Sequence, residues 1–265
     1  MNAKGVLSLL VLSVASTLIA TGCNRATSDT HISIYYAHDM TADIRGDAQV
    51  ELASPKGIRV IIDVAIPAVI SKPPTREDIL LTTHTDYDHY SYSFASAFPG
   101  KQLCKEEGRI DASDVKVSSI PSSHSDEPPS DKPPYTNIIY VIDINGLRVA
   151  HFGDTRQLKL TEKQIKELGK VDIAFMNFWG EEERFFIHVK QLKPRVVIPT
   201  HLGSGDTNMK AAFGMIMKTW PTYMVEEKQV DLSSSALPRK TSFLLVGERT
   251  KEYSRTFSIP KWKTR

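Results

Sequence analysis

The chain has 265 residues, of which 41% are hydrophobic and 24% are charged, a composition typical of a folded globular protein rather than of a disordered or collagen-like chain. A near balance of 33 Lys and Arg against 31 Asp and Glu leaves a formal net charge of +2, which excludes a strongly basic nucleic-acid-binding protein. With two cysteines in total, a scaffold held by several disulfides is also excluded.

The first residues have the pattern of a secretion signal. Lys4 precedes an uncharged apolar stretch, residues 6–20, which is too short to span a bilayer comfortably. The segment Ala20-Thr21-Gly22-Cys23 resembles the lipobox of bacterial lipoproteins, in which the cysteine becomes the first residue and carries the lipid. The resemblance implies a signal peptide over residues 1–22, lipidation of Cys23 and an extracytoplasmic location in the bacterial cell envelope. A plain secretory signal and an uncleaved anchor are the alternatives.

A folded domain is expected to follow a short polar tether. Residues 24–30 are small and polar without periodicity, so we predict a tether over residues 23–30 and one domain over residues 31–265. The domain begins with strand patterns at three places that are rich in β-branched or aromatic residues: 32–36, 48–53 and 58–64. These three segments predict a β-meander.

The middle of the chain alternates strands with one proline-rich segment. An apolar run at residues 79–83 and an alternating pattern at residues 115–120 each predict a strand. Residues 121–134 contain five prolines among Ser, Asp and Glu, which predicts an extended loop. This loop is either a surface excursion or a rim or lid over a site.

A hairpin and a capped helix are the clearest local signals. Asn145-Gly146 lies between apolar runs at residues 137–144 and 147–152, which predicts a tight β-hairpin because this dipeptide readily supplies two positive φ angles. Farther on, residues 161–164 have the form of a capping box and Gly169 is placed as a helix stop. A short helix is therefore predicted between them.

The last third of the chain alternates strands and helices. Strands are predicted at residues 171–176, 196–198 and 242–246, and helices at a segment ending before Pro194 and at residues 207–218. Because strands cluster early and alternate with helices later, the sequence predicts an α/β sandwich with its helices outside.

Histidines and aspartates follow four of the predicted strands, where side chains emerge at one edge of a sheet. Strand alternation places His84 and Asp86 on one side, while Asp88 and His89 turn in another direction. The later strands are followed by three further residues of these types: His124, Asp154 and His201. Imidazoles and carboxylates are ligands for zinc, manganese and iron. The remaining histidines, His31, His38, His151 and His188, lack such placement, and we interpret them as structural or surface residues.

In chain order, the patterns H-x-D-x-D-H, a spaced His, G-D-T and P-x-H resemble the metallo-β-lactamase superfamily. The likeness is closer to the branch of metal-dependent hydrolases that includes ascorbate-6-phosphate lactonase and the N-acyl-phosphatidylethanolamine phospholipase D, and it covers most of residues 31–205. It implies an αββα sandwich of two β-sheets with helices outside. It also implies one or two divalent ions, zinc, manganese or iron, along the edge between the sheets.

The resemblance also implies a ligand set. His84, His124 and Asp154 would hold one metal, and Asp88, His89, Asp154 and His201 the other, with Asp154 bridging. Asp86 stands where the family usually has its second histidine, which favours manganese or iron over zinc because a carboxylate is a harder donor. Asp47 is a second departure, at a place where relatives of this branch often have histidine. The two substitutions indicate either a retuned site or a decayed one.

The function implied by this resemblance is hydrolysis of an ester, lactone or phosphodiester bond by a metal-activated water, with Asp88 orienting that water or taking its proton. Antibiotic-hydrolysing members commonly carry cysteine at the position of Asp154, so β-lactamase activity is disfavoured. We expect a small-molecule or lipid-like substrate, no nucleic-acid partner and contact with a membrane through the lipid anchor. A catalytically inactive, membrane-tethered binding module is the alternative, and the sequence indicates no oligomeric state.

Overall fold

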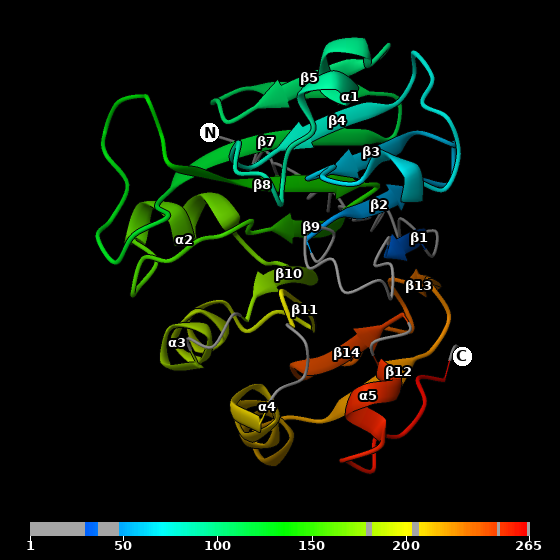
Figure 1. The fold of residues 1–265 in the computed structure, drawn as a ribbon, viewed down its shortest axis with the longest axis vertical. Coiled ribbons are helices and arrows are strands. Elements are labelled where there is room, and N and C mark those ends of the chain that lie inside the picture. The colour runs from blue at the N-terminus through cyan, green and yellow to red at the C-terminus, as the bar shows by residue number, and fades with distance from the viewer. Residues whose placement is uncertain (1–29, 37–47, 179–181, 203–206, 248–249, 264–265) are drawn as a thin grey trace, which may run out of the picture.

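Two mixed β-sheets pack face to face at the centre of this computed structural model, which describes residues 30–36, 48–178, 182–202, 207–247 and 250–263 (Figure 1). The predicted signal peptide, Cys23, His38 and Asp47 lie outside the described residues. One sheet has six strands in the order β13 (Gln229–Ser233), β1 (His31–Tyr36), β2 (Val50–Ala53), β3 (Arg59–Ile62), β4 (Ile79–Thr82) and β5 (Lys101–Cys104). Eight strands form the other, in the order β12 (Thr222–Val225), β14 (Ser242–Val246), β11 (Val196–Thr200), β10 (Ile173–Asn177), β9 (Leu147–His151), β8 (Asn137–Ile144), β7 (Val115–Ser122) and β6 (Arg109–Ala112).

Helices cover the outer faces of both sheets. The eight-stranded sheet packs against α2 (Glu162–Leu168), α3 (Glu182–Leu192), α4 (Thr207–Thr219) and α5 (Thr250–Ser254). On the six-stranded sheet, α1 (Tyr92–Ala97) contributes Ala95 to a smaller apolar cluster, and a short 3₁₀ helix spans Pro67–Val69. The predicted αββα arrangement is therefore confirmed. None of the helices in the described ranges is long and apolar enough to cross a membrane.

The alternation of side chains along β8 shows how the layers are joined. Ile138, Tyr140 and Ile142 point into the core between the two sheets, whereas Ile139 and Val141 point toward the helices. All five side chains are buried, so this strand is apolar on both faces. The central layers of the sandwich are fixed by burial of this kind, which contributes roughly 25 cal/mol for each Å² of apolar surface removed from water.

The two clearest local predictions are confirmed. Asn145 and Gly146 turn the β8–β9 hairpin with φ angles of 50° and 85°. At the start of α2, the Thr161 side chain accepts a hydrogen bond from the Gln164 backbone, and the Gln164 side chain accepts one from the Thr161 backbone. Gly169 ends the helix with a φ of 60°. Local sequence chemistry thus sets both elements.

The proline-rich loop begins later than its predicted start at residue 121. Pro121 and Ser122 belong to β7, where they pair with Ile138 and Asn137 of β8. Pairing between β6 and β7 ends at Ser118, so β8 alone borders the strand at Pro121. A proline, which has no N–H to donate, is tolerated at such an edge.

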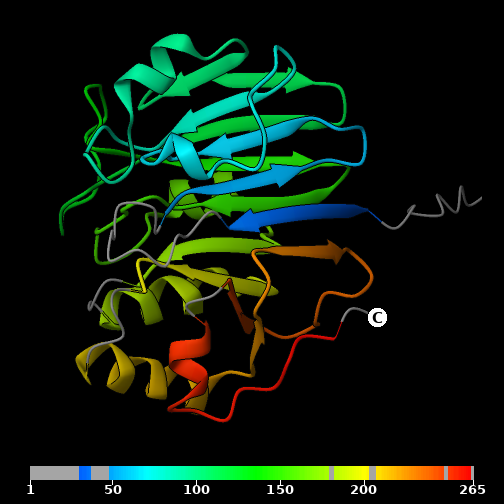
Figure 2. The ribbon, with the colours of Figure 1, turned by 45° about the vertical axis from the view of Figure 1, so that its right-hand side comes forward.

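Strands β3, β4, β7, β9, β10 and β11 all end at the same edge of the sandwich. Two hydrogen bonds fasten the sheets together there, from the Tyr140 hydroxyl to the Thr82 carbonyl and from the Ile138 N–H to the Thr83 carbonyl. The opposite edge holds the β8–β9 turn and the start of β1, because Oγ1 of Thr30 donates to the Asn145 carbonyl at 3.1 Å. Figure 2 shows β1 in blue beside β13 in orange, although the two are far apart in the sequence.

Candidate metal centre

The seven side chains that the sequence predicted as ligands come together at the edge where these strands end. They form two groups: Asp88, His89, Asp154 and His201, and then His84, Asp86 and His124. Within each group, one potential ligand atom from every residue lies within 4.8 Å of the others. The two sides expected for His84 with Asp86 and for Asp88 with His89 correspond to these two groups.

The first group has the spacing of ligands around one ion. Nε2 of His89 and Nε2 of His201 are 3.0 Å apart, and Oδ1 of Asp154 lies 3.4 Å from the former and 3.0 Å from the latter. Ligand atoms around a tetrahedral zinc are about 3.3 Å apart, because the bonds are roughly 2.0–2.1 Å long. Asp88 stands beside this triangle, with Oδ2 at 3.9 Å from Nε2 of His89. These residues therefore fit a divalent ion.

Asp154 reaches both groups through its two oxygens. Oδ1 faces His89 and His201, while Oδ2 lies 3.3 Å from Nε2 of His124. In the second group, Nε2 of His84 is 3.8 Å from Oδ2 of Asp86, whose side chain is 57% exposed. Because Asp154 directs one oxygen toward each group, its carboxylate is able to bridge two ions.

The imidazole of His84 is arranged to ligate a cation. Oγ1 of Thr83 donates to Asp63 at 2.8 Å and lies 3.0 Å from Nδ1 of His84, so it accepts the Nδ1 proton. Nε2 then carries the lone pair, and this buried atom has no hydrogen-bond partner among the described residues. Burial, together with the charge of His89, lowers the pKa of His84 to about 4, which keeps the ring neutral.

Asp63 is an important residue of the site that the sequence analysis missed. It is fully buried, and Oδ2 accepts from Nδ1 of His89 at 2.9 Å while Oδ1 accepts from the Thr83 N–H at 2.8 Å. Burial opposes both charges, but the mutual attraction lowers the pKa of Asp63 and raises the pKa of His89 to about 10. Asp63 directly follows β3, a position at which the sequence analysis looked for site residues. It was overlooked because the strand predicted at residues 58–64 included it.

Gly153 and two asparagines position Asp154. Gly153 has a φ of 52°, and a Cβ there would lie 2.7 Å from Oδ1 of Asn137, so the backbone conformation and the space both favour glycine. Asn137 accepts from the Asp154 N–H at 3.1 Å, and Asn177 donates to Oδ1 of Asp154 at 2.8 Å. Burial alone would raise the pKa of Asp154, yet His201 and the other neighbouring imidazoles hold it well below its usual range.

The other described histidines lie outside both groups. His151 is buried, stacks on Phe175 and hydrogen-bonds the Ala48 carbonyl, and His188 donates to the Gln157 carbonyl. His31 is exposed in β1. Their interpretation as structural or surface residues agrees with these positions.

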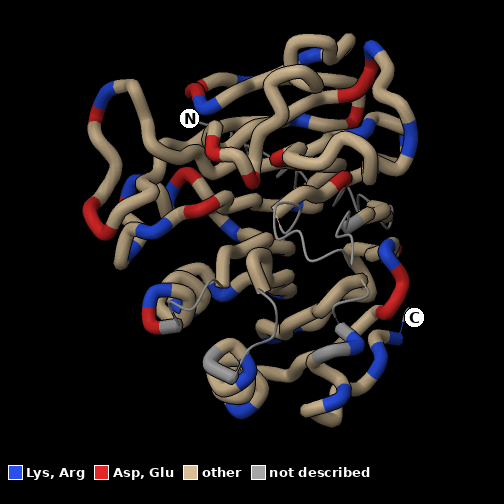
Figure 3. The backbone as a smooth tube through the Cα atoms, in the orientation of Figure 1, with Lys and Arg blue, Asp and Glu red and all other residues tan. Residues whose placement is uncertain are grey.

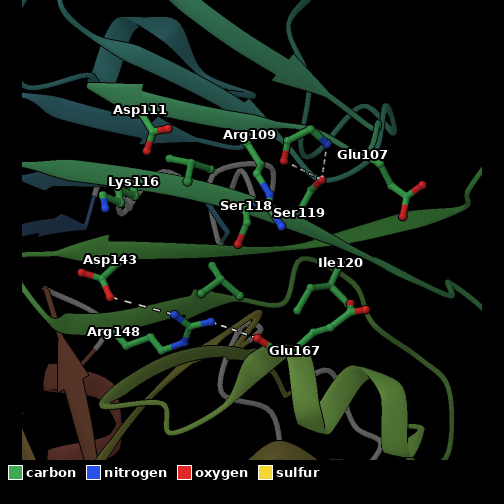
Figure 4. A pocket seen from close by; sticks show the side chains of 13 residues that line it. Glu107, Arg109, Asp111, Lys116, Ser118, Ser119, Ile120, Asp143, Arg148 and Glu167 are labelled. Atoms are coloured by element: carbon green, nitrogen blue, oxygen red, sulfur yellow. Dashed lines mark hydrogen bonds and ion pairs between the residues drawn. The ribbon is translucent and has the colours of Figure 1, made fainter. Parts of the chain in front are cut away.

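A large groove of about 910 Å³ lies away from the predicted ligands, on the outer face of β6–β9 (Figure 4). Acidic and basic side chains are mixed along it, and Asp143 lies 3.9 Å from Arg148. Arg148 also donates to the carbonyls of Glu167 and Leu168 at the end of α2. The groove is the solvent face of a sheet, and the His/Asp edge is the better candidate for chemistry.

Comparison with known proteins identifies a family and several similar proteins. Residues 45–201 match the family described as the beta-lactamase superfamily domain. A metal-dependent hydrolase of Thermococcus onnurineus is 28% identical over 186 residues, which are 59% of this chain and 81% of that protein. A proposed Zn-dependent hydrolase of the metallo-beta-lactamase superfamily from Thermotoga maritima has a TM-score of 0.55 and 19% identity, covering 81% of this chain and 99% of that chain. A metallo-beta-lactamase fold protein from Bacillus subtilis has a TM-score of 0.48 and 10% identity over 80% and 96% of the two chains.

Proposed function

Since this chain belongs to the metallo-beta-lactamase superfamily, we propose that it is a metal-dependent hydrolase that cleaves an ester, lactone or phosphodiester bond. The single observation that carries the proposal is the pair of His/Asp groups joined by Asp154. A curated relative with 28% identity bears the same general activity in its name. The bond type rests on the resemblance of the sequence motifs to the lactonase and phospholipase branch.

The residues present account for the binding of cations. His84, His124 and Asp154 would hold one ion, Asp88, His89, Asp154 and His201 the other, and Asp86 stands at the rim of the first group. The chemistry that a divalent ion would supply there is acidification of a water molecule and polarisation of the bond under attack. Carboxylates in the set extend the choice of ion from zinc toward manganese or iron.

Asp88 is the residue best placed to handle a proton. Its side chain is 16% exposed, so one face reaches solvent while Oδ2 stays 3.9 Å from Nε2 of His89. A carboxylate in this position orients the attacking water and accepts its proton, and it then returns that proton to the leaving group. His89 has no such freedom, because Asp63 holds its ring from behind.

The location and the substrate class are further parts of the proposal. The lipobox-like segment ending at Cys23 supports a lipid-anchored protein in the bacterial cell envelope. A small-molecule or lipid-like substrate is consistent with that location. An inactive binding module remains the second candidate, and the aspartate at position 86 is the feature that favours it.

Metal content, measured by mass spectrometry on the full chain purified in detergent without chelator, tests the proposal. We expect nearly stoichiometric zinc, manganese or iron, lost in His84→Ala and Asp154→Ala, together with hydrolysis of a lactone or a phosphodiester. Asp111→Asn, in the exposed part of β6, is the matched control and should keep both properties. Absence of bound metal, together with failure to take it up, would refute the enzyme and leave the binding module. Bound metal without any hydrolysis would also favour the module.

A further inference from the structure

Arg156 is a cationic side chain at the candidate metal centre that the proposed hydrolysis does not use. Nη2 of its guanidinium lies 3.7 Å from Oδ2 of Asp154, the oxygen that faces His124. The backbone of Arg156 is fixed, because its N–H donates to the Ser123 carbonyl at 2.7 Å. The side chain is 36% exposed. The backbone of Arg156 is therefore held beside the site, and its side chain extends into solvent.

Asp154 does not need this arginine as a partner. Its oxygens already lie within 3.5 Å of Asn177, His201, His89 and His124, all at shorter distances than Arg156. At 3.7 Å the guanidinium is beyond hydrogen-bond length and makes one contact rather than a bidentate pair. Most of its donors are therefore available to another group.

Arginines with a structural role look different in this fold. Arg59 is buried and donates to Glu51, Asp78 and the carbonyls of Lys72 and Pro73. The fork of such a side chain is occupied by the protein itself. Arg156 has no comparable set of partners in the described ranges, so its fork is suited to a planar or tetrahedral anion.

The charge balance of the site points the same way. Basic and acidic residues are interspersed along the chain (Figure 3), so attraction of an anion to this edge must come from local groups. The carboxylates of Asp86, Asp88 and Asp154, together with that of Asp63 behind His89, would balance two divalent cations, since histidine ligands are neutral when they bind metal. With two ions bound, Arg156 would add a positive charge beyond this balance, and its single contact with Asp154 at 3.7 Å leaves most of its donors available.

From this placement we propose that Arg156 binds an anionic oxygen group of the substrate, a phosphate or a carboxylate, next to the bond that is cleaved. This inference rests on the proposed hydrolase and narrows its substrate class to anionic compounds. Neutral esters and lactones would lack the partner of the guanidinium. The source of the anion, a phosphodiester or a carboxylate-bearing ester, is distinguished by the choice of probe.

Binding of inorganic phosphate to the metal-loaded full chain, measured by calorimetry, tests the proposal without any turnover. We expect Arg156→Gln to weaken phosphate binding by about tenfold to a hundredfold, the usual effect of losing a charge-assisted hydrogen bond. Arg156→Lys should lie between the two, because it keeps the charge and loses the fork. Arg109→Gln changes a residue of the groove on the outer face of β6–β9 and is the control. This variant should bind phosphate as tightly as the unaltered chain. Equal phosphate binding by Arg156→Gln, or none by the unaltered chain, would overturn the proposal.

Hydrolysis of two chromogenic probes separates this inference from the proposed function. For bis(4-nitrophenyl) phosphate, Arg156→Gln should raise KM by tenfold or more, whereas KM for neutral 4-nitrophenyl acetate should not change. The carboxylate source is tested with the 4-nitrophenyl monoester of succinic acid. Equal effects on charged and neutral probes would contradict a role in anion binding. If no probe is cleaved, the proposed hydrolase activity is refuted. The phosphate titration still tests whether Arg156 binds an anion. Loss of metal from Arg156→Gln would show a structural role instead and would overturn the inference.

Discussion

Oδ2 of Asp63 lies 2.9 Å from Nδ1 of His89, and both side chains are fully buried. The contact turns Nε2 of His89 toward His201 and Asp154, so a residue that faces no solvent sets the direction of a candidate ligand. Thr83 extends the same arrangement to His84 by donating to Asp63 and accepting from the second imidazole. Asp63 therefore orients one histidine of each group.

Replacement of this carboxylate gives the first prediction. Asp63→Asn should weaken metal binding by about tenfold to a hundredfold, because an outer partner of a ligating histidine fixes its ring and raises its basicity. Competition of the protein with a fluorescent zinc chelator measures the affinity. Asp111→Asn, an exposed residue of β6, serves as the control. A dissociation constant within twofold of the unaltered chain would show that Asp63 has no such role.

Asp86→His should shift the metal preference toward zinc. The substitution puts a neutral nitrogen donor in place of a carboxylate oxygen beside His84 and His124. After growth in medium with equal zinc and manganese, the zinc-to-manganese ratio of the purified variant should exceed that of the unaltered chain. The ratio is measured by mass spectrometry. Identical metal contents of the two proteins would argue against Asp86 as a determinant of ion identity.

His188 makes the folded state sensitive to acid. Burial, aided by Arg184, lowers its pKa to about 4, and the neutral ring donates to the Gln157 carbonyl at 2.8 Å. In the unfolded chain, the imidazole of His188 is protonated below about pH 6.5. In the folded chain, it takes up this proton only near pH 4. The contribution of His188 to the free energy of unfolding is therefore complete above pH 6.5. It declines by up to about 3 kcal/mol as the pH falls toward 4.

Urea unfolding at pH 7.5, 6.0 and 5.0 measures this dependence. The stability difference between the unaltered chain and His188→Gln should be largest at pH 7.5 and should shrink as the pH falls. His31→Gln, in an exposed position of β1, should show no such trend. A constant difference between the unaltered chain and His188→Gln at all three pH values would exclude the proposed protonation.

Cys23→Ala should abolish labelling by a radioactive fatty acid in bacterial cells and release the protein from the membrane fraction. The reason is that the lipobox-like segment assigns the lipid to this thiol alone. Cys104→Ala is a matched control, because it removes the other cysteine, which is half-buried near the end of β5. Continued labelling of Cys23→Ala would contradict the lipoprotein interpretation.

Local chemistry explains which parts of the fold could be predicted from the sequence. Asn145-Gly146 and the Thr161–Gln164 capping box specify their turns by themselves, so the hairpin and α2 were predicted closely. Short elements such as α1, β5 and β6 were missed. Their burial patterns are weak because α1 buries Ala95 alone and the two strands lie at the edges of their sheets.

The site was predictable in part for a similar reason. Strand ends mark an edge of a sheet, and that rule predicted where the seven candidate ligands lie, but it assigns no partner to a residue inside an apolar run. Asp63 acquires its role only from its contact with His89, which follows a different strand, β4. A contact of this kind depends on which strands pair side by side and on how the loops after them pack, and a single sequence does not display either.

The position of Thr30 determines how an anchored molecule would stand at a bilayer. Thr30 contacts the β8–β9 turn, at the edge opposite the candidate metal centre. Seven residue steps separate it from Cys23, and even fully extended they span roughly 25 Å. That is about the length of the eight-residue strand β8, so the linker is too short to pass around the body. A lipid on Cys23 would hold the candidate metal centre on the side away from the bilayer, so of the two proposed substrate classes a small molecule from the aqueous phase fits this orientation better than a lipid-like one.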